Sequence, residues 1–109
     1  MTTIKAFTDE GQSRMLAEFL PHESADMYYP IKGASPKFGV ALLVSTNIPC
    51  WSLAALLKVI GHYTLQTVSD SKSVIIISEN GNPISSSSYP QPVDACYELI
   101  LKLHELNLL

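Results

Sequence analysis

The last stretch of the chain, residues 89–109, most constrains the fold, because it predicts a long helix that is apolar around most of its circumference. Pro92 suits the first helical turn, and Asp94 suits the positively polarised helix end. On a wheel of 3.6 residues per turn, the charged residues share one narrow stripe: Asp94, Glu98, Lys102 and Glu105. The apolar arc is about 240° wide, more than twice what a surface helix needs. We therefore expect cover on two sides, from the same chain or from a second subunit.

Four residues of this helix are the interface candidates: Tyr97, Leu101, His104 and Leu108. His104 falls near the centre of the apolar arc, between Tyr97 and Ile100 on the wheel. Imidazole can be buried when it is hydrogen-bonded, so we interpret His104 as a core or interface residue rather than a catalytic one.

Two further helices are marked by their ends. The first is expected to begin at Thr8 or Asp9, with Gln12 in a capping box, and Pro21 should end it or restart a short turn. Its apolar face would comprise Met15, Leu16, Phe19 and Leu20. The second is expected after Ser52 as N-cap, with Gly61 past its end. Its apolar face would comprise Leu53, Leu56, Leu57 and Ile60.

The strands are predicted with different clarity. Residues 62–69 and 73–78 read as a hairpin, and 84–89 as a third, more polar edge strand or a solvated loop. The run at 74–77 is unbroken and apolar, which favours cover on both faces. Earlier in the chain, 27–29 is expected to be an edge strand or link because Pro30 follows, and 38–44 a buried strand. For 32–48 and 84–91, strand and loop both stay open.

The fold class that follows is α+β, in one domain of residues 1–109. The expected order is helix, short strand or loop, helix, antiparallel β-meander and C-terminal helix packed on the sheet.

Composition excludes several function classes. The formal net charge is −3, and the seven basic residues are scattered, which argues against nucleic acid as a partner. No apolar run approaches the roughly 20 residues needed to cross a bilayer, and no signal-peptide pattern is present, so we expect no membrane partner and a cytoplasmic location. Cys50 and Cys96 are expected to be buried free thiols, because their number and spacing fit neither a disulfide framework nor a metal knuckle. No cofactor is expected.

The segment PHESADMYYP at 21–30 contains a candidate polar site, His22, Glu23 and Asp26. The spacing resembles a helical zinc-protease motif, which would need a third protein ligand and an open position for water. His62 and His104 lie on other predicted elements, and Pro21 interrupts the helix where the motif would sit. We therefore interpret the segment as a solvated cap and turn.

Two blocks, PCWSLAALLKVI at 49–60 and YPQPVDACYELILKLHELNLL at 89–109, resemble small uncharacterised proteins of prophages and mobile elements of gut Bacteroidales. The resemblance covers about the C-terminal 60 residues and adds the ESADMYY segment. It implies a leucine-rich helix, two or three strands and a terminal helix opened by Pro92, Asp94 and Ala95. The family has no assigned activity, so the resemblance transfers no catalytic residues.

These observations favour a non-enzymatic accessory or interaction protein, phage or mobile-element related, that self-associates as a homodimer or other homo-oligomer or binds another protein. The alternative is a small metal-binding protein or hydrolase that uses His22, Glu23 and Asp26. A third hypothesis is an inhibitor or regulator of a host protein.

Overall fold

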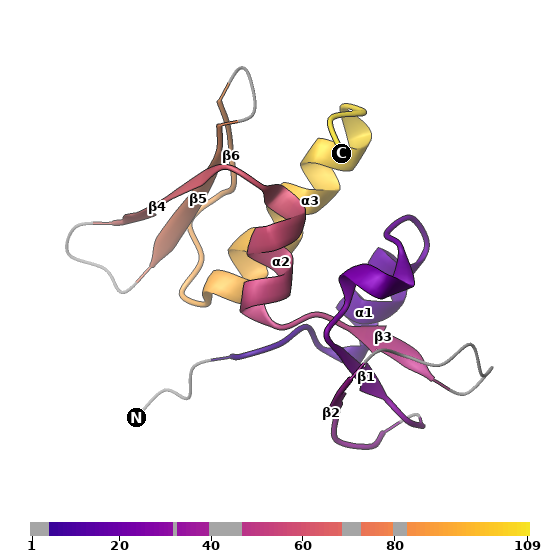
Figure 1. Cartoon of the computed structure of the whole chain (residues 1–109). Coiled ribbons are helices and arrows are strands. Elements are labelled where there is room, and N and C mark those ends of the chain that lie inside the picture. The colour runs from indigo at the N-terminus through magenta and orange to yellow at the C-terminus, as the bar shows by residue number, and fades with distance from the viewer. Residues whose placement is uncertain (1–4, 32, 40–46, 69–72, 80–82) are drawn as a thin grey trace. The chain divides into compact units, whose positions relative to one another are not determined.

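A computed structural model describes residues 5–31, 33–39, 47–68, 73–79 and 83–109. Over these residues the fold is α+β, as predicted, with three α-helices and two small antiparallel sheets of three strands each (Figure 1). The chain forms two compact units, which we describe separately. Ala6–Ala55 is called the N-terminal unit, and Leu56–Leu109 together with Lys5 is called the C-terminal unit.

The N-terminal unit packs one helix against a small sheet of strand order β2-β1-β3. Its elements are α1 (Glu10–Ala17), a 3₁₀ turn η1 (His22–Ser24), β1 (Met27–Tyr29), β2 (Lys37–Phe38) and β3 (Ile48–Cys50). Met27, Tyr29 and Cys50 form the core of the sheet, and Phe7 and Ile48 pack against them.

Helix α1 begins as its sequence predicts. The Asp9 side chain accepts a hydrogen bond from the Gln12 amide at 2.8 Å, and the Gln12 side chain accepts one from the Asp9 amide at 3.1 Å. This reciprocal capping box satisfies two amides that the first turn leaves unpaired. The helix ends at Ala17, earlier than expected, and Met15 is 43% exposed, so the predicted apolar face is buried only in part.

The prediction that 27–29 forms an edge strand or a link is wrong. β1 is the central strand, paired with β2 on one side and β3 on the other. Pro30 permits this because it follows the last paired residue and therefore removes no ladder donor. Pro49 lies in β3, an edge strand, where the missing N–H is tolerated.

The expected buried strand at 38–44 is not observed at its first two residues, which are the ones that the structure describes. Phe38 ends the two-residue strand β2 and is 81% exposed. Residues 40–46 of this prediction lie outside the described residues.

The C-terminal unit contains the predicted meander, with strand order β4-β5-β6 (Figure 1). Its elements are α2 (Leu53–Ile60), β4 (Tyr63–Thr67), β5 (Val74–Ser78), β6 (Ile84–Ser85) and α3 (Pro92–Glu105). The boundary between the units falls within α2, so only Leu56–Ile60 of this helix belong to the C-terminal unit. α3 contacts β5 and β6, which confirms the expected packing of the C-terminal helix on the sheet. In β5, Ile76 and Ser78 are buried, whereas Ile75 and Ile77 are half-buried.

Helix α2 also has the predicted ends. The Ser52 hydroxyl accepts a hydrogen bond from the Ala55 amide at 3.2 Å, which identifies Ser52 as the N-cap. Gly61 follows the last turn with a φ of 86°, a left-handed conformation that glycine adopts without strain. Trp51, which precedes the N-cap, and Leu56, on the predicted apolar face of the helix, are both fully buried.

Candidate interaction sites

The polar segment at 22–26 forms a structural junction. The Asp26 carboxylate accepts hydrogen bonds from the Ser52 amide, at 3.0 Å, and from the Ser52 hydroxyl, so it holds the residue that caps α2. The Ser24 hydroxyl donates to the Pro21 carbonyl and accepts from the Trp51 indole N–H at 2.9 Å. These contacts connect the turn η1 to the chain just before α2.

The geometry gives the metal alternative no ligand set. His22 and Glu23 lie in the 3₁₀ turn, with His22 half-buried and Glu23 exposed, and Asp26 follows the turn with its oxygens engaged by Ser52. Over the described part of the chain, no group of three or more His, Cys, Asp or Glu side chains could hold a metal ion.

A second polar cluster, which the sequence did not reveal, is buried between α1, β1 and β3. The Thr8 hydroxyl hydrogen-bonds with that of Ser13 at 2.8 Å and accepts from the Trp51 amide at 3.1 Å. The Tyr29 hydroxyl and the Cys50 thiol both donate to the Thr8 carbonyl, at 2.7 Å and 3.4 Å. Because these groups satisfy one another, the cluster fixes the packing of the N-terminal unit and leaves no free polar group for catalysis.

The thiols confirm the expectation of buried free cysteines. Burial raises the pKa of Cys96 to about 12. Burial also raises the pKa of the Cys50 thiol, although hydrogen bonds with Thr8, Ser13 and Tyr29 act in the opposite direction. The thiolate is the nucleophilic form of cysteine, so neither side chain has the electropositive, accessible environment of a reactive thiol.

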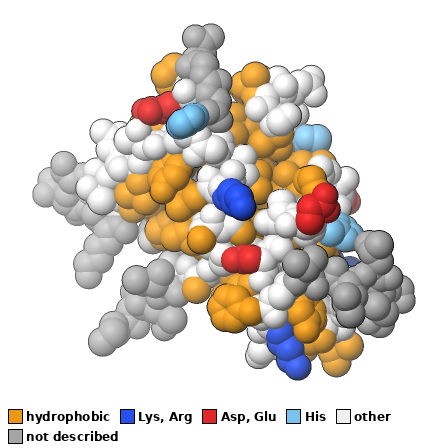
Figure 2. All heavy atoms as spheres, viewed as in Figure 1, with side chains coloured by type: hydrophobic (Ala, Val, Ile, Leu, Met, Phe, Trp, Pro, Cys, Tyr) orange, Lys and Arg blue, Asp and Glu red, His pale blue; other side chains and the backbone are white. Residues whose placement is uncertain are grey.

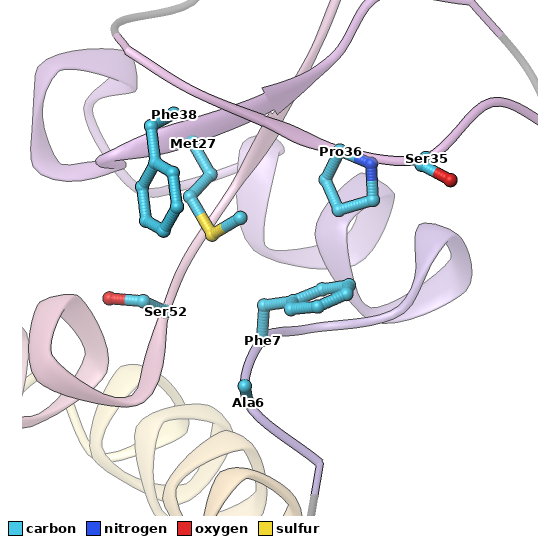
Figure 3. A pocket seen from close by; sticks show the side chains of 7 residues that line it. All are labelled: Ala6, Phe7, Met27, Ser35, Pro36, Phe38 and Ser52. Carbon is cyan, nitrogen blue, oxygen red and sulfur yellow. The ribbon is translucent and has the colours of Figure 1, made fainter.

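An open apolar pocket of about 480 Å³ lies in the N-terminal unit. Its lining residues are Ala6, Phe7, Met27, Ser35, Pro36, Phe38 and Ser52. Figure 3 shows Met27 and Phe38 side by side, as their pairing between β1 and β2 requires, with Phe7 and Pro36 bordering the same space. The pocket has apolar walls, two hydroxyl groups and no titratable side chain, so it fits binding better than acid–base chemistry.

The interface candidates on α3 border its buried face. Six residues of the helix are fully or almost fully buried: Val93, Ala95, Cys96, Leu99, Ile100 and Leu103. Tyr97 and Leu101 are half-buried, and His104 is exposed, so its place in the core of this chain is not observed. Beyond the helix, the exposed fractions of Leu106, Leu108 and Leu109 are 53%, 52% and 51%. The apolar arc is therefore covered along one face and open toward its C-terminal end.

The face of the molecule in the space-filling view carries few charged side chains. Hydrophobic side chains reach the surface in several places, and the charged side chains between them are few and separated (Figure 2). This agrees with a composition of 47% hydrophobic and 16% charged residues, against about 25% charged in an ordinary domain.

No helix within the described ranges is long and apolar enough to cross a membrane. No family model, curated protein or solved structure matches this chain.

Proposed function

We propose that this chain is a small non-enzymatic interaction protein that self-associates through the C-terminal end of α3 and the residues that follow it. The single observation that carries the proposal is the incomplete cover of α3. Leu106 and Leu108 are more than half exposed, and Tyr97 and Leu101 are half-buried beside a fully buried face. Exposed neighbouring apolar side chains of this kind characterise surfaces that bind protein.

The site chemistry supports a binding role over a catalytic one. The buried polar cluster around Thr8 is satisfied internally, the two thiols have raised pKa values, and Asp26 caps the start of α2 through Ser52. A general base or a nucleophile would need a titratable group that faces a cleft. The pocket of the N-terminal unit provides no such group.

The test replaces Leu108 with Glu and compares solution mass by light scattering across protein concentration. A buried leucine replaced by a charged side chain costs about 2–3 kcal/mol at an interface, so the dimer dissociation constant should rise by roughly 30- to 150-fold for each substituted copy. Leu108 is exposed, so the fold should persist, which circular dichroism verifies. Leu101→Glu should act in the same direction.

Met15→Glu is the matched control, because Met15 is also an exposed apolar residue but lies on α1. It should leave the mass unchanged. Equal masses for the wild type and Leu108→Glu at every concentration would contradict the proposed contact.

A further inference from the structure

The outer strand of the meander presents an open edge. β4 pairs with β5 on one side, and no strand among the described residues lies on its other side (Figure 1). All five residues of β4 are exposed, including Tyr63 at 42% and Leu65 at 43%. Sheet edges of this kind are templates for pairing with another strand.

Two hydrogen bonds between the ends of β4 and the neighbouring chain show which backbone groups of β4 face the open edge. At one end of the strand the Glu79 amide donates to the His62 carbonyl at 2.9 Å, and at the other the Val68 amide donates to the Ser73 carbonyl at 3.0 Å. In an antiparallel ladder, hydrogen-bonded and non-hydrogen-bonded pairs alternate. The even-numbered residues of β4 therefore bond to β5, and the odd-numbered residues point their N–H and C=O groups outward.

The strand lacks the features that usually block edge pairing. Its sequence, YTLQT, contains neither a charged residue nor proline. The Thr64 hydroxyl donates to the Glu79 carboxylate at 2.6 Å, on the face opposite Tyr63 and Leu65. The side chains of Tyr63, Leu65 and Thr67 thus lie on one face of the sheet. The fully buried Ile76, which pairs with Leu65, lies on the same face.

We propose that β4 pairs antiparallel with β4 of a second copy of this chain, about a two-fold axis at Leu65. This inference rests on the proposed self-association and adds a second contact to the one on α3. In this register Leu65 faces Leu65 and Tyr63 faces Thr67, so every outward N–H meets an outward C=O. Apolar and β-favouring side chains then lie opposite each other, and no like charges meet across the axis.

A second copy is favoured over a foreign strand because the edge is self-complementary. The side chains of β4 match their own copies in the symmetric register, because the exposed Leu65 meets Leu65 and the exposed Tyr63 meets Thr67, with no charge on either strand. An acidic or basic peptide would find no opposite charge within β4.

The experiment measures amide hydrogen exchange by NMR at low and high concentration of the full chain, with solution mass recorded in parallel. The amides of Tyr63, Leu65 and Thr67 should exchange at least tenfold more slowly at the high concentration. The amides of Thr64 and Gln66, already bonded to β5, should be protected at both concentrations. An α3 contact alone would not produce this alternation along β4.

Two other outcomes separate this inference from the proposed function. If the mass rises with concentration but the three outward amides exchange at a constant rate, the strand contact is wrong and self-association through α3 stands. If the chain stays monomeric at every concentration, both proposals fail.

The substitution Leu65→Pro tests the same contact by removing a hydrogen-bond donor from it. Proline is tolerated in an edge strand where the N–H faces outward, so this change removes the central donor without removing a bond to β5. Concentration-dependent protection of Tyr63 and Thr67 should disappear, while Thr64 and Gln66 stay protected. If the proline variant no longer forms β4, Leu65→Lys replaces it in the test. This variant would place two ammonium groups at the two-fold axis, and the concentration-dependent protection of Tyr63 and Thr67 should again disappear. Persistence of the alternating protection in Leu65→Lys would overturn the proposal.

Discussion

At the scale of single residues, the polar segment at 22–26 has a structural role. The Asp26 carboxylate accepts hydrogen bonds from Ser52, and the Ser52 hydroxyl caps α2. This chain of hydrogen bonds connects the segment after the turn η1 to the start of the helix. Ser24 reinforces the connection through the Trp51 indole. The Asp26 carboxylate therefore positions the capping residue by accepting hydrogen bonds from both its amide and its hydroxyl.

Removing the Asp26 carboxylate should therefore weaken the fold. We expect Asp26→Ala to lower the free energy of unfolding by about 1–2 kcal/mol, because it leaves the Ser52 amide without its acceptor. Urea denaturation followed by circular dichroism measures the change. Glu23→Ala is the control, since Glu23 is an exposed neighbour in the turn, and it should stay within about 0.5 kcal/mol of the wild type.

The same proteins also test the metal alternative. Zinc should leave the melting temperature of the wild type and of Asp26→Ala unchanged. A rise in the wild type that is absent from Asp26→Ala would support a metal site in this segment instead of a junction.

At the scale of secondary-structure elements, the serine-rich segment is ordered by α3. Ser86 is buried, its hydroxyl accepts from the Ile76 amide at 3.0 Å, and its own amide donates to the Ile76 carbonyl, so it extends the pairing of β6. Glu98 accepts hydrogen bonds from the Ser87 amide and hydroxyl and pairs with Lys102 at 3.1 Å. Lys102 also donates to the Ser85 carbonyl. The predicted edge strand is therefore observed at Ile84–Ser85 and continued by Ser86, whereas Ser87 is exposed and hydrogen-bonds with Glu98 of α3.

Glu98 makes this arrangement dependent on pH. Burial acts to raise its pKa, but hydrogen bonds with Tyr89, Lys102 and Ser87 outweigh it and leave the pKa lowered from 4.5. A carboxyl with a lowered folded pKa stabilises the fold above its unfolded pKa, and this stabilisation is lost as the pH falls through the folded value. Wild-type stability should therefore decrease below pH 4.5 more steeply than that of Glu98→Gln.

Urea denaturation between about pH 3 and pH 7 measures this difference, and at neutral pH Glu98→Gln should be less stable by about 1 kcal/mol. Glu105→Gln, an exposed change on the same helix, is the control and should follow the wild type. Parallel pH curves for the wild type and Glu98→Gln would contradict a stabilising role of the ionised carboxyl.

Elements with local signals were predictable from sequence, whereas those that depend on distant partners were not. The capping box of Asp9 and Gln12, the Ser52 cap and the start of α3 at Pro92 each involve a few neighbouring residues, and all three are confirmed. β1 and β3 are three residues long, too short for periodicity to identify, and the position of β1 depends on partners about 10 and 20 residues away. The division into two sheets was missed for the same reason.

The candidate sites follow the same rule. Burial along α3 was indicated by its helical pattern, whereas the four interface candidates are half-buried, as Tyr97 and Leu101 are, or exposed, as His104 and Leu108 are. The pocket brings together Phe7, Met27 and Phe38, which lie far apart in the sequence, so no spacing could reveal it. The open edge of β4 depends on strand order, which a sequence pattern does not specify.

At the scale of the whole molecule, the two compact units divide a short chain. Each contains about half of the 109 residues and one three-stranded sheet, within the described ranges. Domains of that size are marginal alone, because they bury a small fraction of their surface. Helix α2 runs without interruption from Leu53 to Ile60 across the boundary after Ala55. We therefore expect the units to unfold together, as a single domain would.

The two cysteines make this expectation measurable, because Cys50 belongs to the N-terminal unit and Cys96 to the C-terminal unit. Both thiols are fully buried and have raised pKa values, so alkylation of the native protein at pH 8 should be slow and should require opening. Labelling across a urea series, resolved by peptide mass spectrometry, should give one midpoint for both thiols, equal to the midpoint from circular dichroism. The unfolded protein, which labels rapidly at both sites, is the control for intrinsic reactivity. Two separate midpoints would show that each unit opens independently and that residues 1–109 do not behave as one cooperative domain.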